Sequence, residues 1–187
     1  ISAIVCGAIF GNHDYHGRHE DELARELGAV GVRVLRNECA RVDSGAGVLA
    51  LVGLEDLEES RALDLEGSRA ALRAGDVELV LRHNPAGGPA IARSGCAAIL
   101  AGHTHGHQLD LPLLRRLGQA HPGDRIELGT TALITSRGLG VSVLPLRLCS
   151  PAEIWSSSCQ RRRKRAMYGS LALDQGVVWV GREARTA

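Results

Sequence analysis

Short apolar runs alternate with stretches of mixed polarity along the chain, a block pattern typical of proteins that alternate strands and helices. The apolar runs predict strands over residues 3–10, 32–35, 48–52, 77–81 and 97–101, and a β-rich end over residues 126–134 and 141–148. The mixed stretches predict helices over residues 19–28, 60–74 and 88–94, with Gly28 closing the first and Ser60 as a possible N-cap of the second. The pattern therefore predicts the α/β fold class.

Three of the expected strands run directly into segments that carry histidine. Gly11-Asn12-His13-Asp14 follows the first strand, His83 follows residues 77–81, and Gly102-His103-Thr104-His105-Gly106-His107 follows residues 97–101. In layered α/β folds, ligands bind outside the carboxyl ends of the strands, on loops that the sheet holds in place. We therefore expect these three segments to share one site.

The residue types in these segments point to metal chemistry. Neutral imidazole and side-chain oxygen suit borderline divalent ions such as zinc, manganese and iron. In an extended loop His103 and His105 would point to the same side, because side chains alternate with a period of two. Two such ligands can reach one ion or two neighbouring ions.

Each motif taken alone also has a plainer interpretation. A single histidine after a strand, such as His83, is more often a hydrogen-bonded structural residue than a ligand. An isolated His-x-His pair also occurs in amidohydrolases and metallo-β-lactamases, although Gly106-His107 does not supply the Asp-His that the metallo-β-lactamase pattern requires. The order of the three motifs together is far more specific than any one of them.

Composition excludes several classes of protein. The formal net charge is +1, 44% of residues are hydrophobic and 23% are charged, as in an ordinary globular protein. Apolar runs such as residues 97–101 are far shorter than the roughly 20 residues of a membrane-spanning helix. Five of the 22 basic side chains form one run, residues 161–165. No aromatic residue interrupts this run, so we expect a solvated tail segment and not a nucleic-acid site.

The succession of Gly11–Asp14, a strand-ending His83 and Gly102–His105 resembles the calcineurin-like metallophosphoesterase family. Further segments resemble its YaeI/YkuE-type phosphodiesterase branch, namely residues 51–56, 111–112, 136–140 and 144–148. The resemblance implies a two-sheet α-β-β-α sandwich over residues 1–154, followed by a divergent basic and Ser-rich tail over residues 155–187.

The resemblance also implies two divalent metal ions (manganese, zinc or iron) and assigns ligands to them. Asn12, His83 and His103 match the ligands of the second ion, and His105 matches a ligand of the first. Two cations about 3.5–4 Å apart can clamp phosphate oxygens while a bridging hydroxide attacks in line. The implied substrate is a phosphate ester, which can be a monoester, a diester or a pyrophosphate link.

Two further residues receive catalytic roles from the resemblance. His13 would lie over the phosphate and protonate or stabilise the departing oxygen, and Asp14 would orient the His13 ring. A positioned histidine of this kind typically accelerates such a step about 10²–10⁴-fold.

The sequence departs from the family pattern ahead of Asn12. The family motifs Asp-x-His and Gly-Asp-x-x-Asp normally precede this point, whereas residues 1–10 contain neither Asp nor His. We therefore expect an N-terminally incomplete sandwich, a fragment whose own activity is an open question. The alternative is a catalytically incomplete member that binds one metal or a partner without turnover. The expected location is the cytoplasm or the membrane periphery, by analogy with the branch.

Overall fold

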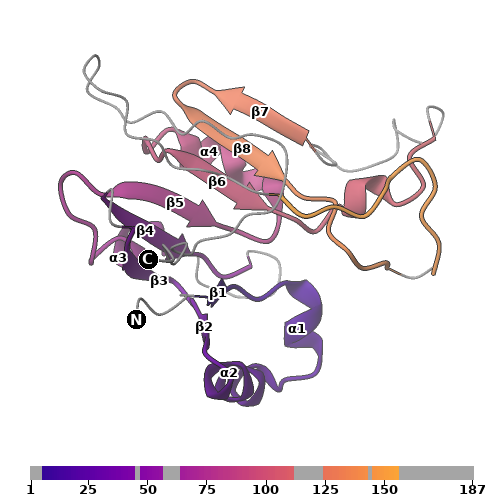
Figure 1. The fold of residues 1–187 in the computed structure, drawn as a ribbon, viewed down its shortest axis with the longest axis horizontal. Coiled ribbons are helices and arrows are strands. Elements are labelled where there is room, and N and C mark those ends of the chain that lie inside the picture. Colours follow the sequence, from indigo (N-terminus) through magenta and orange to yellow (C-terminus); the bar gives the residue numbers. More distant parts are fainter. Residues whose placement is uncertain (1–5, 45–46, 57–63, 112–123, 143–144, 156–187) are drawn as a thin grey trace, which may run out of the picture.

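The computed structural model describes residues 6–44, 47–56, 64–111, 124–142 and 145–155 (Figure 1). Its strands are β1 (Cys6–Ala8), β2 (Val32–Val34), β3 (Glu38–Asp43), β4 (Val48–Gly53), β5 (Val77–Leu81), β6 (Ala98–Ala101), β7 (Asp124–Leu128) and β8 (Thr131–Thr135). Its helices are α1 (Asn12–His16), α2 (Glu20–Ala29), α3 (Leu65–Ser68) and α4 (Gly88–Ala92), with 3₁₀ turns η1 (Pro85–Gly87) and η2 (His105–His107).

The strands form a six-stranded sheet in the order β3-β4-β5-β6-β8-β7 and a separate two-stranded sheet, β1-β2. Strands β4, β5, β6 and β8 are parallel, and the outer strands β3 and β7 are antiparallel to their neighbours. The carboxyl ends of β5, β6 and β8 therefore meet at one edge. Both α1 and η2 lie on that side, at the right of Figure 1.

Apolar side chains cover both faces of the large sheet because neighbouring strand residues point to opposite sides. In β4 and β5, Leu51 and Leu79 belong to one buried cluster, whereas Val52 and Val80 belong to the other. The first cluster includes Leu35 from the end of β2, and the second includes Ile91 from α4. Full burial of one such side chain stabilises the fold by about 1.5–3 kcal/mol, so the two clusters hold the strands and their ends in place.

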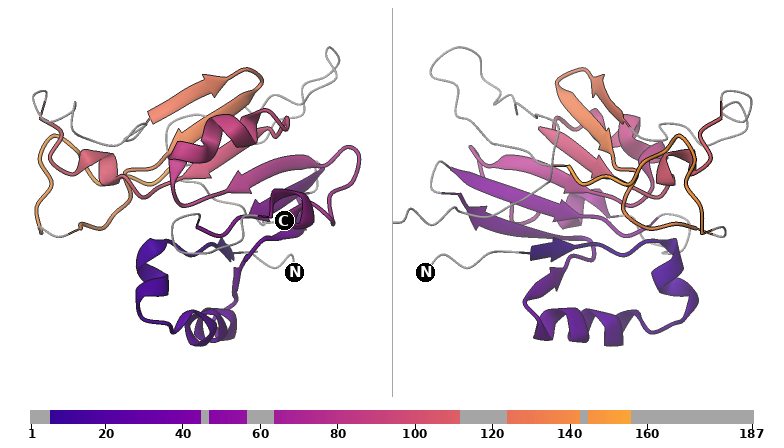
Figure 2. Two further views of the ribbon diagram at one scale, coloured as in Figure 1. Left: turned by 180° about the vertical axis from the view of Figure 1, so that it is seen from behind. Right: turned by 45° about the vertical axis from the view of Figure 1, so that its right-hand side comes forward.

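Helices and the small sheet flank this core, as the two views of Figure 2 show. The mixed α/β class with two sheets and flanking helices, as predicted, is confirmed. Among the described residues, none of the helices combines the length and the apolar character needed to cross a bilayer. The tail expected from residue 155 onward, with its basic run, falls almost wholly outside the described residues, and so does Ser60.

Several local expectations were wrong. The helix predicted over residues 60–74 is described only from residue 64, as the single turn α3, where the Asp64 carboxylate accepts the Gly67 N–H at 2.7 Å. Residues 126–134 are β-rich as expected and belong to the hairpin of β7 and β8. The described part of residues 141–148 contains no strand, and only an isolated bridge joins Leu109 to Leu148. Helix α2 also runs one residue past Gly28.

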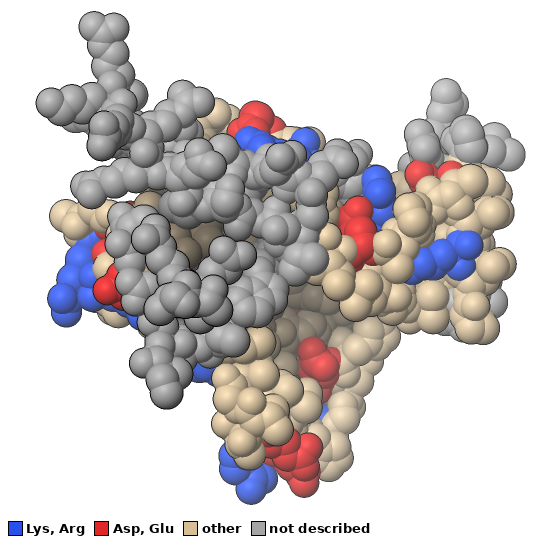
Figure 3. All heavy atoms as spheres, viewed as in Figure 1, with Lys and Arg blue, Asp and Glu red and all other residues tan. Residues whose placement is uncertain are grey.

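Acidic and basic side chains lie in small mixed groups on the face shown in Figure 3, and the described residues form no broad area of one sign there. Ion pairs contribute to this mixing. Arg36 pairs with Asp21 at 2.6 Å, and Arg41 pairs with Asp76 at 2.8 Å.

Candidate metal centre

Three donor atoms from three separate segments converge at the carboxyl edge of the large sheet. Nε2 of His83, two residues after β5, lies 3.0 Å from Oδ1 of Asn12 and 3.0 Å from Nδ1 of His103. The His83 and His103 rings meet edge to face, with centroids 4.7 Å apart. The structure thus brings together the three side chains that the resemblance assigns to one ion.

Hydrogen bonding alone does not account for this geometry. A neutral ring nitrogen has either one proton or one lone pair, so Nε2 of His83 can satisfy only one of its two neighbours. Ligand atoms bound to one ion at about 2.0–2.1 Å lie about 3.0–3.4 Å apart, which matches both spacings. Among the described residues no three His, Cys, Asp or Glu side chains gather as a metal site, and the third donor here is an amide oxygen. Two imidazoles and an amide oxygen fit a borderline divalent cation.

The start of α1 places Asn12 against His83, and Gly11 makes this approach possible. A Cβ atom at residue 11 would lie 2.6 Å from Cε1 of His83, too close for any side chain. The Gly11 N–H donates to the Asp14 carboxylate at 2.8 Å, which closes the first turn of the helix. Asp14 therefore supports the segment that carries Asn12. Its predicted role in orienting His13 stays a prediction.

His13 lies exposed on α1, and its ring meets the ring of His16 edge to face at 5.1 Å. Burial is the main cause of the lowered pKa of His105, and the positive charge of Arg147 lowers that pKa further. Because α1 and η2 both lie at the carboxyl edge of the large sheet, His13 and His105 share the side at which Asn12, His83 and His103 meet (Figure 1).

Burial also lowers the pKa of His83, and the charge of His103 adds to the effect. The carboxylates of Asp56 and Asp14 oppose it. A histidine with a pKa below 6.5 is neutral at pH 7, so its lone pair is available to a cation without loss of a proton. The two rings with lowered pKa, His83 and His105, are in the protonation state that metal ligation requires.

The segment that carries His105 has an unusual backbone. The φ angles of His103, His105, His107 and Gln108 are all positive, at 68°, 51°, 63° and 49°. The prediction of an extended loop was therefore wrong here, since residues 105–107 form the turn η2. A left-handed conformation costs a non-glycine residue about 1–2 kcal/mol, and it persists only where the surroundings fix it.

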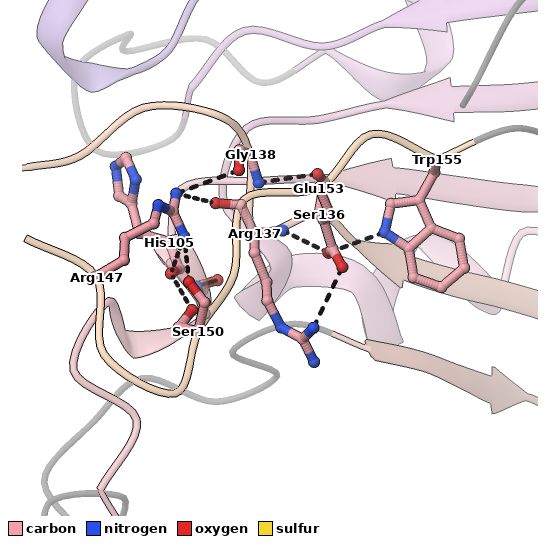
Figure 4. Close-up of polar contacts among 10 residues, drawn as sticks. His105, Ser136, Arg137, Gly138, Arg147, Ser150, Glu153 and Trp155 are labelled. Carbon is pink, nitrogen blue, oxygen red and sulfur yellow. Dashed lines mark hydrogen bonds and ion pairs between the residues drawn. The ribbon is translucent and has the colours of Figure 1, made fainter. Parts of the chain in front are cut away.

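Arg147 supplies much of that support (Figure 4). Its Nη1 donates to the carbonyls of His105 and Ser150, each at 3.2 Å. Its Nη2 donates to the carbonyl of Arg137 at 2.7 Å, and its Nε donates to the carbonyl of Gly140 at 2.9 Å. The Ser150 hydroxyl adds a further bond to the His105 carbonyl at 3.0 Å. We call this set of bonds from Arg147 and Ser150 the arginine clamp.

The carboxylate of Glu153 holds the loop after β8, whose carbonyls accept bonds from the clamp. Glu153 accepts from the Arg137 N–H at 2.8 Å and from the indole N–H of Trp155 at 3.0 Å (Figure 4). Gly106 allows the turn to lie directly on this support, because a Cβ there would meet Oγ of Ser150 at 2.5 Å. The turn and the loop after β8 therefore pack as one unit.

Two contributors to this region were missed from the sequence. Asp56, 2% exposed, follows β4, and its negative charge opposes the lowering of the His83 pKa. The rule that singled out histidines after strand ends would also have found it, had carboxylates been included. Arg147 had no such signal, because its acceptors are backbone carbonyls that any sequence provides.

Comparison with known proteins found related bacterial proteins. The chain is 36% identical over 107 residues to a metallophosphoesterase named YkoQ from Bacillus subtilis, a match covering 56% of this chain. It is 29% identical over 152 residues to the metallophosphoesterase YkuE from the same organism, and 34% identical over 152 residues to phosphodiesterase YaeI from Escherichia coli. These two matches cover 78% and 77% of this chain.

The matches extend over only part of each relative. The chain spans 39% of YkoQ, 53% of YkuE and 54% of YaeI, so it covers about half the length of these proteins or less. No protein-family model matches the sequence, and no solved structure matches it.

Proposed function

Because the chain belongs to the calcineurin-like metallophosphoesterase family, we propose that it binds divalent metal and acts on phosphate esters as a hydrolase. The observation that carries the proposal is the convergence of Asn12, His83 and His103, with both spacings at 3.0 Å. A set of two imidazoles and one amide oxygen at a strand-end edge suits zinc, manganese or iron.

In the proposed mechanism the side chains of this edge divide into two ligand groups. Asn12, His83 and His103 hold one ion, and His105 contributes to the binding of a second. Metal bound there supplies Lewis-acid polarisation of the phosphoryl oxygens and an acidified water. Asp56 and Asp14 favour positive charge at His83, and the same negative field favours a nearby cation.

His13 is the proposed general acid. It lies exposed on α1, beside the ligand groups yet outside the convergent set, so its ring can meet a substrate oxygen. A ring nitrogen of His13 would donate a proton to the departing oxygen, as the family resemblance implies.

The test of this proposal uses the purified 187-residue chain with added manganese or zinc and an aryl phosphodiester. We expect His13→Ala to lower turnover about 10²–10⁴-fold while the metal content stays unchanged. The matched control is His19→Ala, an exposed histidine at the start of α2, which should leave turnover unchanged. Turnover that survives His13→Ala would overturn the assignment of the general acid.

One observation favours a second candidate, binding of a single ion without turnover. The three donors of the described group meet at Nε2 of His83, and none of the three atoms is a carboxylate oxygen. Metal analysis separates the two candidates. The single-ion candidate predicts at most one ion per chain and no hydrolysis, whereas the two-ion hydrolase predicts two.

Substrate and location are finer proposals. We favour a phosphodiester over a monoester or pyrophosphate because one relative is named a phosphodiesterase. Peripheral membrane association, which the branch resemblance implies, predicts that the chain sediments with anionic vesicles. Absence of sedimentation at low salt would leave the cytoplasmic alternative.

A further inference from the structure

We propose that Arg147 is a positioning residue for His105, and that the arginine clamp fixes the His105 imidazole for a metal ion. The inference rests on the proposed function, since it concerns one ligand of the proposed centre. Its starting observation is the convergence of bonds from one guanidinium on the backbone of two loops, η2 and the segment after β8 (Figure 4).

The clamp first fixes the backbone under the ring. The carbonyl of His105 accepts from both Nη1 of Arg147 and Oγ of Ser150, at 3.2 and 3.0 Å. These bonds hold a peptide unit whose residue has a φ of 51°, in a turn where Gly106 and His107 also have positive φ angles. Without them the turn can relax toward right-handed conformations, which would redirect the side chain.

The clamp also ties this turn to the loop after β8. Nη2 of Arg147 donates to the carbonyl of Arg137 at 2.7 Å, and Nε donates to the carbonyl of Gly140 at 2.9 Å. One guanidinium therefore holds the His105 backbone against two carbonyls of that loop, which fixes the position from which the His105 ring projects.

Arginine is the side chain that this geometry requires. Its planar guanidinium offers five N–H donors in a fixed fork, and here they reach the carbonyls of His105, Arg137, Gly140 and Ser150. A lysine ammonium has three donors around a single point and cannot reach divergent acceptors on two loops together. We therefore expect Arg147→Lys to keep the charge and lose the positioning.

The test is nitrogen NMR of the histidine rings in the metal-free, ¹⁵N-labelled chain. We expect one set of His105 signals in the parent protein, and shifted or doubled His105 signals in both Arg147→Gln and Arg147→Lys, because the turn can then relax. The matched control is Arg41→Gln, which removes a two-bond pair with Asp76 beside the opposite ends of the strands. That control should leave the His105 signals unchanged.

A second readout uses zinc titration. Loss of the clamp should lower the affinity for the ion that uses His105 about 10–100-fold and leave the affinity for the ion held by His83 unchanged. Unchanged His105 signals in folded Arg147 variants would overturn the positioning role, even if their thermal stability falls. If the Arg147→Gln chain fails to fold, Ser150→Ala removes one bond to the same carbonyl and should shift the His105 signals in the same direction. Because the NMR readout needs no turnover, absence of hydrolysis would count against the proposed function alone.

Discussion

The two ligand groups of the candidate centre rest on different kinds of support. His83 and His103 each follow a central parallel strand by two residues, so the sheet and its two apolar clusters fix where they begin. His105 lies only two residues further on, yet it belongs to a left-handed turn that bonds to a segment 42 residues away.

This difference shows how far beyond a strand end a sheet can position a functional side chain. One or two residues beyond a strand end, the hydrogen bonds of the sheet still determine the direction of the chain. Beyond that, the chain needs side chains from elsewhere, and here Arg147 and Ser150 provide them. We therefore expect the group around His83 to tolerate damage to the clamp, and the following variants test that expectation.

The largest effect should come from His83→Ala. Since Nε2 of His83 is the atom that both other donors face, its removal should lower affinity for zinc more than about 100-fold, beyond the loss typical of outer-shell changes. Isothermal titration calorimetry measures this, with His19→Ala as the control and circular dichroism to verify folding. Unchanged affinity would place the ion elsewhere.

Gly11→Ala should cause a smaller loss of zinc affinity. This substitution places a Cβ 2.6 Å from Cε1 of His83. We expect the free energy of unfolding in urea to fall by about 1–3 kcal/mol, and zinc affinity to fall with it. The matched variant Gly28→Ala, in α2, places its Cβ where no atom lies within 4 Å. Its free energy of unfolding should rise by about 0.5–1 kcal/mol, and a decrease would contradict the steric explanation.

The clamp itself is weakened by Ser150→Ala. Ser150 is 1% exposed and donates to the His105 carbonyl, so we expect a loss of about 1 kcal/mol in the free energy of unfolding. Zinc affinity at the group around His83 should not change. The comparison variant is Ser44→Ala. The Ser44 hydroxyl donates to the Gly47 carbonyl on the surface, so its loss should lower the free energy of unfolding by only about 0.5 kcal/mol or less. Equal loss at both ion sites would show that the two groups are not independent.

Tyr15→Phe should have the smallest effect on stability at neutral pH. Burial, followed by the charge of Glu55, raises the pKa of Tyr15 above its ordinary value of 10. The folded state therefore holds this proton more tightly than the unfolded chain does. Its stabilisation is complete below about pH 10 and is lost as the pH rises through the folded pKa. Thermal melts from pH 8 to 11 should show a decline that Tyr15→Phe reduces, and an equal decline in both would contradict the assignment.

Local sequence signals were enough to predict the central strands β4, β5 and β6 and the residues that follow β5 and β6, whereas β3 was missed. Residues 77–81 match β5 at both ends, and the histidine after it meets Asn12 as expected from the strand-end rule. Helix α1 was missed because Asn12–His16 has no apolar periodicity. It is instead held by the Asp14 cap and by an edge-to-face contact between Phe10 and Tyr15, with centroids 5.9 Å apart.

The turn η2 could not be predicted for a different reason. The pattern His-x-His suggests alternation, whereas the positive φ angles depend on tertiary bonds from Arg147 that have no local signature. The described part of residues 141–148 forms no strand, and its backbone bonds to the segment after η2 instead. The Ser142 N–H donates to the Gln108 side chain at 2.6 Å, and the Leu148 N–H donates to the Gln108 carbonyl at 2.8 Å.

The contact between Asn12 and His83 joins residues 71 positions apart. A chain that has formed helix α1 alone, or β5 alone, lacks part of this donor set, so the proposed metal would bind the assembled molecule better than either part. Binding of that kind stabilises the folded state by mass action, by about 2.7 kcal/mol when free metal is 100 times the dissociation constant. Metal in the surroundings would then govern how much of this protein survives heat and proteases, whatever its rate of turnover.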